Sequence, residues 1–146
     1  MTGAVISLIP LLIVILIIGT AMAAASRPDL ARVSIGAGEV VVRPLGVLKI
    51  FTLRSRIVIP AASIRQVSVV SDPLDGPSPG LRWPGIGLPG LQAGTFVRGG
   101  VRSFWVCGRG PEALRLALSD GPYDYVIVQM GNCRELLDQI RAAGIA

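Results

Sequence analysis

The hydrophobic pattern of the chain opens with an uncharged and almost wholly apolar run from Gly3 to Ala25. All 14 basic and all 9 acidic residues come after this run. Folded as an α-helix, the run would be roughly 31–35 Å long, which is enough to cross the hydrocarbon core of a bilayer. The pattern therefore predicts a transmembrane helix at residues 5–25, with a short tail at residues 1–4 and a linker at residues 26–30.

A cleavable signal peptide is the alternative interpretation of the same run. Ala21-Met22-Ala23 and Ala23-Ala24-Ala25 both match the small-x-small pattern that precedes a signal cleavage site. Against this, no Lys or Arg stands between Met1 and the apolar segment, and the run is longer than a usual signal h-region. We therefore expect an uncleaved anchor, with a secreted domain after cleavage as the alternative and a buried soluble helix as the weakest of the three.

The charges on either side of the run predict its orientation. The N-terminal side carries only the α-amino group, whereas Arg27 and Arg32 follow the other end closely. Basic residues near a membrane span tend to stay in the cytoplasm. We expect a single-pass protein of the cell membrane whose N-terminus is outside and whose domain is cytoplasmic.

The pattern then changes to short strands, and the 120 residues after Ser26 are enough for one modest core. Glycine turns at Gly36-Ala37-Gly38 and Gly99-Gly100 suit hairpins, and Ser71 to Gly80 has the composition of a loop. We place one domain at residues 31–146. Its predicted strands are Ala31–Ile35, Glu39–Arg43, Val47–Leu53, Ser55–Ile59, Ile64–Val70, Thr95–Arg98, Arg102–Cys107, Leu114–Leu118 and Tyr123–Met130.

The last segment has the period of an amphipathic helix. Its apolar residues recur at i, i+3, i+4 and i+7, namely Cys133, Leu136, Leu137 and Ile140. Asn132 suits the N-cap, Glu135 follows it as in a capping box, and Gly144 suits the C′ position. Because so short a helix is not stable alone, its apolar stripe must close over the sheet. The fold class predicted is α+β and mainly β.

Charge and composition exclude several kinds of site. The chain has a net charge of +5 and no His, so it lacks the commonest general base and the commonest metal ligand. The two cysteines, Cys107 and Cys133, are too few for a zinc site, and we expect buried thiols, although a helix N-terminus could lower the pKa of Cys133. They would pair only if the domain faced an oxidising compartment. We predict no cofactor and no metal.

Neither catalysis nor nucleic-acid binding is indicated by the remaining charged residues. Asp72 with Asp75 and Asp120 with Asp124 lie in turn sequences, where Asp bonds its own backbone. No carboxylate pair comes with a base, a nucleophile or a set of metal ligands. The basic residues are scattered through the strands instead of gathered on one helix, which argues against nucleic acid. We therefore predict a protein that is not an enzyme.

The most unusual stretch runs from Pro84 to Phe96 and reads PGIGLPGLQAGTF. We interpret it as a stiff structural turn. It resembles the G-x-G-L-P-G-Y-x-x-G-x-F element of bacterial pleckstrin-homology-like (PH-like) domains, with Leu91 in place of the usual aromatic, and Ile59 to Ile64 resembles their I-P-L-x-x-I segment. The matching residues are Gly85, Gly87, Leu88, Pro89, Gly90, Gly94 and Phe96.

The resemblance covers roughly Val33 to Ala143. It implies a seven-stranded, strongly bent antiparallel sheet or partly open barrel, closed at one end by the C-terminal helix. It also implies a binding role and offers no catalytic residues.

Two binding functions remain open. In the first, the domain is a protein-interaction scaffold at the membrane, using a sheet edge or the loop from Ser71 to Gly80, with a partner that the sequence does not name. In the second, Lys49, Arg54 and Arg56 bind anionic lipid headgroups, as resemblance to eukaryotic relatives of the fold implies. We favour the first, because affinity for lipid adds little to a chain that a helix already holds in the bilayer.

Overall fold

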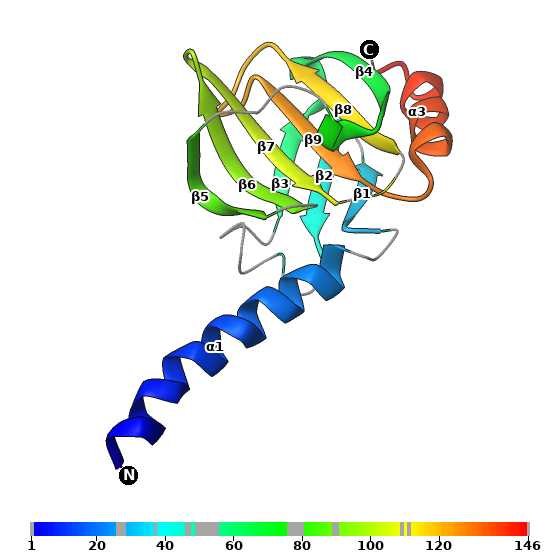
Figure 1. Cartoon of the computed structure of the whole chain (residues 1–146). Helices are drawn as coiled ribbons and strands as arrows, with labels where there is room; N and C mark the ends of the chain where they lie inside the picture. Colours follow the sequence, from blue (N-terminus) through cyan, green and yellow to red (C-terminus); the bar gives the residue numbers. More distant parts are fainter. Residues whose placement is uncertain are drawn as a thin grey trace.

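A computed structural model describes residues 2–25, 29–36, 38–45, 48, 56–75, 81–88, 91–108, 110 and 112–145. One long helix precedes a domain of nine strands and a short terminal helix in this part of the chain (Figure 1). The elements are α1 (Thr2–Ala25), β1 (Ala31–Gly36), β2 (Glu39–Pro44), β3 (Ile57–Pro60), η1 (Ala61–Ser63), β4 (Ile64–Ser71), η2 (Pro73–Asp75), β5 (Leu81–Leu88), β6 (Leu91–Arg98), β7 (Val101–Cys107), β8 (Glu112–Leu118), β9 (Tyr125–Gln129) and α3 (Cys133–Ala142).

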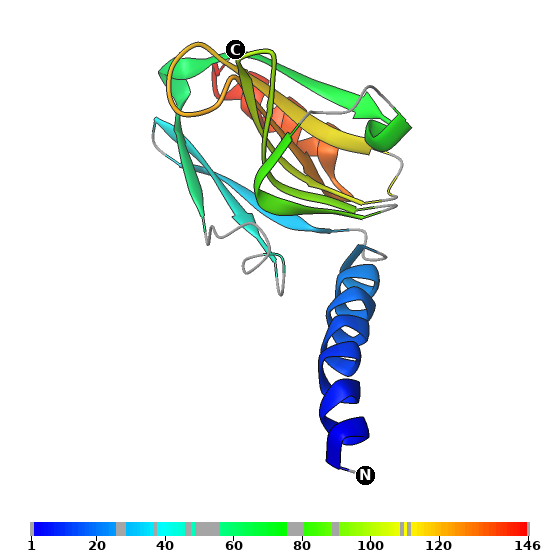
Figure 2. The ribbon, with the colours of Figure 1, turned by 60° about the vertical axis from the view of Figure 1, so that its left-hand side comes forward.

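Helix α1 stands apart from the domain and points away from it (Figures 1 and 2). It begins at Thr2 and ends at Ala25. Every residue from Leu8 to Thr20 is exposed. The structure confirms a helix at the predicted anchor but does not support a span there. No helix among the described residues has both the length and the apolar character that crossing a membrane requires.

The strands form two sheets that lie face to face (Figure 2). The smaller sheet has the order β1-β2-β3 and the larger one the order β4-β8-β9-β7-β6-β5. Within the described residues the sheets do not close into a barrel. The fold is α+β and mainly β, as predicted. All pairs are antiparallel except β7 with β9, which run parallel, unlike the wholly antiparallel sheet that the family resemblance implied.

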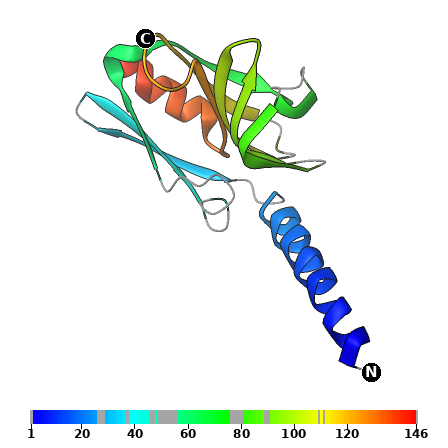
Figure 3. The ribbon, with the colours of Figure 1, turned by 90° about the vertical axis from the view of Figure 1, so that its left-hand side faces the viewer.

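The main core fills the space between the sheets. Val42 and Ile57 reach it from the smaller sheet, and Val106, Leu114 and Val126 reach it from the larger one. Helix α3 lies across the opening between the sheets and adds three buried side chains (Figure 3). These side chains are Cys133, Leu136 and Ile140. The predicted apolar stripe is therefore confirmed, because this face of α3 is buried while the rest meets solvent.

A second, smaller cluster covers the other face of the larger sheet. Phe96 meets Trp105 edge to face at 6.4 Å between ring centroids, and Trp105 meets Tyr125 at 6.2 Å. Ile127 belongs to this cluster, whereas Val126 and Val128 belong to the main core. Successive residues of β9 thus face opposite sides of the sheet, and β9 is buried on both faces.

Strand β9 separates two strands that follow one another in the sequence. It lies between β7 and β8, so the connection from β7 to β8 must pass over the end of β9. The Gln129 side chain holds this connection, because its Oε1 accepts hydrogen bonds from the backbone N–H of Gly108 at 2.7 Å and of Gly110 at 3.1 Å. A Cβ atom at Gly110 would overlap the Gln129 side-chain amide. Only glycine fits so close to this side chain.

Several predictions of local structure are wrong. Leu48 lies in a helical turn, not in a strand, because its N–H donates to the carbonyl of Leu45 at 3.2 Å; the rest of Val47–Leu53 lies outside the described residues. The segment from Pro84 to Phe96, expected as a turn, is largely the β5–β6 hairpin, since antiparallel pairing extends both arms. Asn132 is the N-cap of α3, but with ψ at 35° its side chain makes no capping hydrogen bond.

Because of the contact with Gln129, we expect the stability of the domain to be sensitive to substitution of Gly110. We expect Gly110→Ala to lower the free energy of unfolding by about 1–3 kcal/mol, since the new methyl displaces a buried acceptor from two backbone donors. Gly36→Ala is the matched control, because a Cβ there meets only ordinary contacts beyond 3.8 Å and its φ is not positive. Chemical denaturation measures both. Equal effects of the two changes would contradict the proposed role of Gln129.

Candidate functional site

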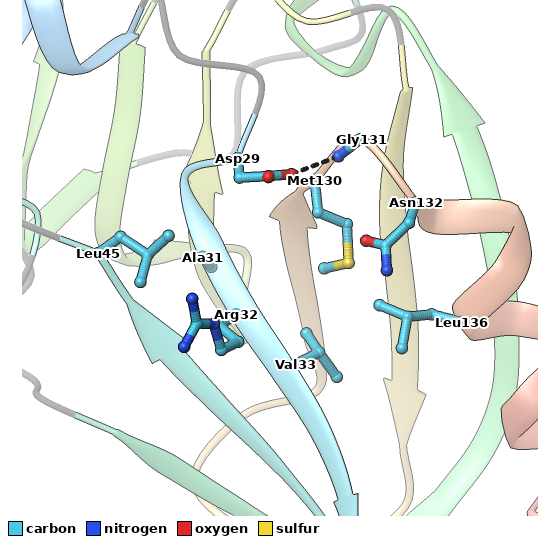
Figure 4. Close-up of a pocket in the computed structure, with 9 residues that line it drawn as sticks. All are labelled: Asp29, Ala31, Arg32, Val33, Leu45, Met130, Gly131, Asn132 and Leu136. Atoms are coloured by element: carbon cyan, nitrogen blue, oxygen red, sulfur yellow. Dashed lines mark hydrogen bonds between the residues drawn. The ribbon is translucent and has the colours of Figure 1, made fainter.

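The candidate site is a hollow where β1 meets the junction between β9 and α3. It has a volume of about 300 Å³. Figure 4 shows Met130, Asn132 and Leu136 on one side of the β1 ribbon and Arg32 and Leu45 on the other. The complete lining is Asp29, Ala31, Arg32, Val33, Leu45, Met130, Gly131, Asn132 and Leu136.

Two hydrogen bonds build the site by joining residues a hundred positions apart. The backbone N–H of Leu30 donates to the carbonyl of Gln129 at 3.2 Å, which brings the start of β1 to the end of β9. The N–H of Gly131 donates to the Asp29 carboxylate at 2.7 Å (Figure 4). The chain that comes from α1 is thereby tied to the segment that leads into α3.

The lining combines an apolar base with a polar rim. Val33, Met130 and Leu136 are buried, whereas Arg32 and Asn132 are exposed. Because the Asn132 side chain makes no capping bond, its amide keeps donor and acceptor capacity toward the hollow. A few polar groups around an apolar base are typical of a site that binds by shape and hydrogen bonding.

The edge of β1 adds a further element to the site. β1 pairs only with β2 in the order of its sheet, so it is an edge strand. Edge strands carry backbone donors and acceptors that can pair with another chain. The hollow beside β1 therefore offers both backbone and side-chain contacts to a ligand, and a bound segment could extend the sheet.

A second hollow, of about 540 Å³, lies by the start of β7 and the end of β8. Asp124, Arg115 and Tyr125, which line it, interact with groups of the domain itself. The Arg102 N–H donates to the Asp124 carboxylate at 2.8 Å, and the Arg115 guanidinium lies 4.9 Å from the centre of the Tyr125 ring. We therefore regard it as a structural feature. Contrary to the prediction from the sequence, Asp124 does not bond the backbone of its own turn, because its carboxylate accepts from Arg102 on β7.

The residues singled out by the sequence do not gather at the first hollow. Lys49 and Arg54 lie outside the described residues, and Arg56 is an exposed residue just before β3. The glycine element lies in the β5–β6 hairpin, where Gly85 pairs with Gly94 and Phe96 is buried, while Pro89 and Gly90 lie outside the described residues. Gly94 has a φ of 134°, which disfavours other residues.

Two residues that position the hollow, Gln129 and Asp29, have a recognisable pattern in the sequence. Gln129 is a polar residue at the end of an otherwise apolar strand, a position that favours a buried hydrogen-bonding role. Asp29 lies just before the first strand, where Asp often bonds backbone N–H groups. What could not be predicted is that Asp29 would find its partner at Gly131.

Both cysteines are buried and neither forms a disulfide. Burial raises the pKa of Cys107 far above its ordinary value, and the nearby Cys133 adds to the shift. Burial also raises the pKa of Cys133, whose Sγ donates to the Met130 carbonyl at 3.1 Å. The lowering at the helix N-terminus considered for Cys133 is therefore wrong, because desolvation outweighs it. No group of His, Cys, Asp and Glu that could hold a metal occurs in the described part of the chain.

Comparison with protein-family models, with curated proteins and with solved structures gives no match to this chain. The resemblance to PH-like domains therefore stays a prediction.

The raised thiol pKa values predict a loss of stability in alkali. Below the pKa of an unfolded thiol, about 8.5, both states keep the proton and the thiols add no pH dependence. Above it the unfolded chain loses protons that the folded chain retains, so the free energy of unfolding falls by up to about 1.4 kcal/mol per pH unit for each thiol.

Denaturation of the wild type and of Cys107→Ala between neutral and alkaline pH measures this effect. We expect the variant to show a shallower decline, because one of the two thiols is gone. Parallel curves would contradict the prediction. Alkylation gives a second measurement, since neither thiol should react in the folded chain and both should react after denaturation.

Proposed function

We propose that the protein is a membrane-attached, non-catalytic binding module. Helix α1 enters the bilayer and holds the domain at its surface, and the hollow beside β1 receives a protein partner. The observation that carries the proposal is the exposed apolar surface of α1. Its large apolar side chains between Leu8 and Ile18 each keep between 44 and 66 % of their surface exposed.

Water is a poor environment for such a helix. Removing apolar surface from water is favourable by roughly 25 cal/mol per Å². The ten exposed Leu, Ile and Val residues of α1 therefore strongly favour transfer of the helix to apolar surroundings. The domain core does not use these residues, because the main core and the second cluster are both built from residues after Asp29. A bilayer is the environment that buries every face of one helix at once.

The partner site follows from the position of the hollow. It lies where the chain from α1 joins the domain, so a membrane-held domain would present it close to the bilayer. A partner that lies at the same membrane meets the β1 edge and the Asn132 amide together. We expect the partner to be bound and not chemically changed, because the described rim offers hydrogen bonds and charge without a nucleophile and base.

Membrane attachment is tested with the full chain expressed in cells. We expect the wild type to stay in the membrane fraction after alkaline extraction. Leu12→Arg/Ile15→Arg should release most of the protein, because two charges in the apolar helix oppose insertion. Leu12→Ile/Ile15→Leu is the matched control and should stay in the membrane. Wild-type protein in the soluble fraction would refute the attachment.

The partner site is tested by photo-crosslinking in the same cells. A photoreactive amino acid replaces Asn132 at the hollow in one variant and Gln139 in a control variant. Both residues are exposed and both belong to the α3 region, but only Asn132 lines the hollow. We expect a discrete crosslinked product for position 132 and none for position 139. The same products at both positions, or none at position 132, would contradict a partner at this site.

A further inference from the structure

The outer face of the smaller sheet carries a row of arginines. Arg32 on β1 and Arg43 on β2 are direct cross-strand partners, and both are exposed. Pairing of β2 with β3 ends at Val42 opposite Ile57, so Arg56 follows as the next residue on the outer side. Arg32 and Arg43 are thus neighbours across β1 and β2, and Arg56 follows on the same face just before β3. We call these three residues the arginine row.

This arrangement is unfavourable for the isolated domain. Like charges directly opposite each other destabilise an antiparallel pair. No carboxylate of the described residues forms an ion pair with the row. The ion pair found among these residues is elsewhere and joins Arg134 to Glu112. Asp29 accepts a backbone hydrogen bond, and Glu39 lies at the opposite end of β2 from Arg43. The positive charge of the row is therefore available to a ligand.

The row lies at the end of the sheet that is nearest to α1. Arg32 follows the end of α1 by seven residues, and Arg43 is the penultimate residue of β2, opposite Arg32. Figures 1 and 3 show this end of the smaller sheet beside the C-terminal end of α1. Beyond the apolar surface of α1, the first charged groups along the part of the chain that the structure describes are those of Asp29 and Arg32.

We propose that the arginine row binds the anionic headgroups of the bilayer that holds α1, and so sets the tilt of the domain on the membrane. The inference rests on the proposed membrane attachment and names a second contact of the same domain. Guanidinium groups suit phosphate oxygens, which they bind in a bidentate way. The helix supplies attachment, and the row supplies orientation. Insertion of one helix does not determine which face of the domain meets the headgroups, whereas three charges on one face would select it.

The test uses the full chain in vesicles of phosphatidylcholine alone or with added phosphatidylglycerol. Ser34→Cys, on the outer face two residues after Arg32, carries a fluorophore, while the native thiols are 0 and 1 % exposed and do not compete for the label. Lipids with a nitroxide at the headgroup report proximity by quenching. We expect severalfold stronger quenching in the anionic vesicles, and its loss at high salt.

Arg32→Gln/Arg43→Gln/Arg56→Gln should abolish the difference between the two vesicle types. Arg65→Gln/Arg102→Gln/Arg141→Gln is the matched control, because it removes the same charge from exposed residues of other elements and should keep the difference. The first variant should denature at the same or a higher denaturant concentration than the wild type, since it relieves repulsion, so a folding defect does not confuse the result.

Each outcome separates the two proposals. Protein that fails to float with either vesicle refutes membrane attachment and the inference with it. Protein that floats with both, but with equal quenching in both, leaves the attachment intact and overturns the inference. Quenching that survives loss of the row, or that falls equally in both triple variants, also overturns it. Charge-dependent quenching that only the row variant loses supports it.

Discussion

The position of β9 between β7 and β8 is the constraint on which the rest of the structure depends. This strand is buried on both faces, and it contributes to the main core and to the second cluster at once. Its last residue, Gln129, makes two kinds of contact. The side chain holds the β7–β8 connection through Gly108 and Gly110, and the backbone carbonyl accepts the N–H of Leu30. The larger sheet and the entry to the smaller sheet therefore meet at one residue.

The candidate site is a consequence of this meeting point. Because Leu30 and Asp29 are bound to the end of β9 and to Gly131, the chain that arrives from α1 is held against the start of α3. The hollow lies between these segments, and β1 leaves it as an edge strand. A change that loosened the end of β9 would therefore disturb the core and the site together.

Local patterns predicted the elements well, and they could not predict how distant elements meet. Alternation of Leu114, Leu116 and Leu118 was enough to identify β8, and the stripe of Leu136 and Ile140 was enough for α3, because these signals depend only on near neighbours. The β5–β6 hairpin was read as a turn because glycine and proline outweigh its apolar residues locally, whereas pairing decides the structure. The parallel pair of β7 with β9 has no local signal at all, since it depends on sheet order.

The arginine row shows where a prediction could have gone further. Gly36 pairs with Glu39 across the hairpin turn, and counting four residues outward on each strand brings Arg32 opposite Arg43. The turn was predicted, so this part of the row was within reach of the sequence. Arg56 was not, because its place depends on β3, which follows a segment whose predicted strand is wrong at Leu48. A like-charged pair that a hairpin register imposes is costly in water. Its place beside the end of an apolar helix is the reason to look for a ligand that supplies the missing negative charge.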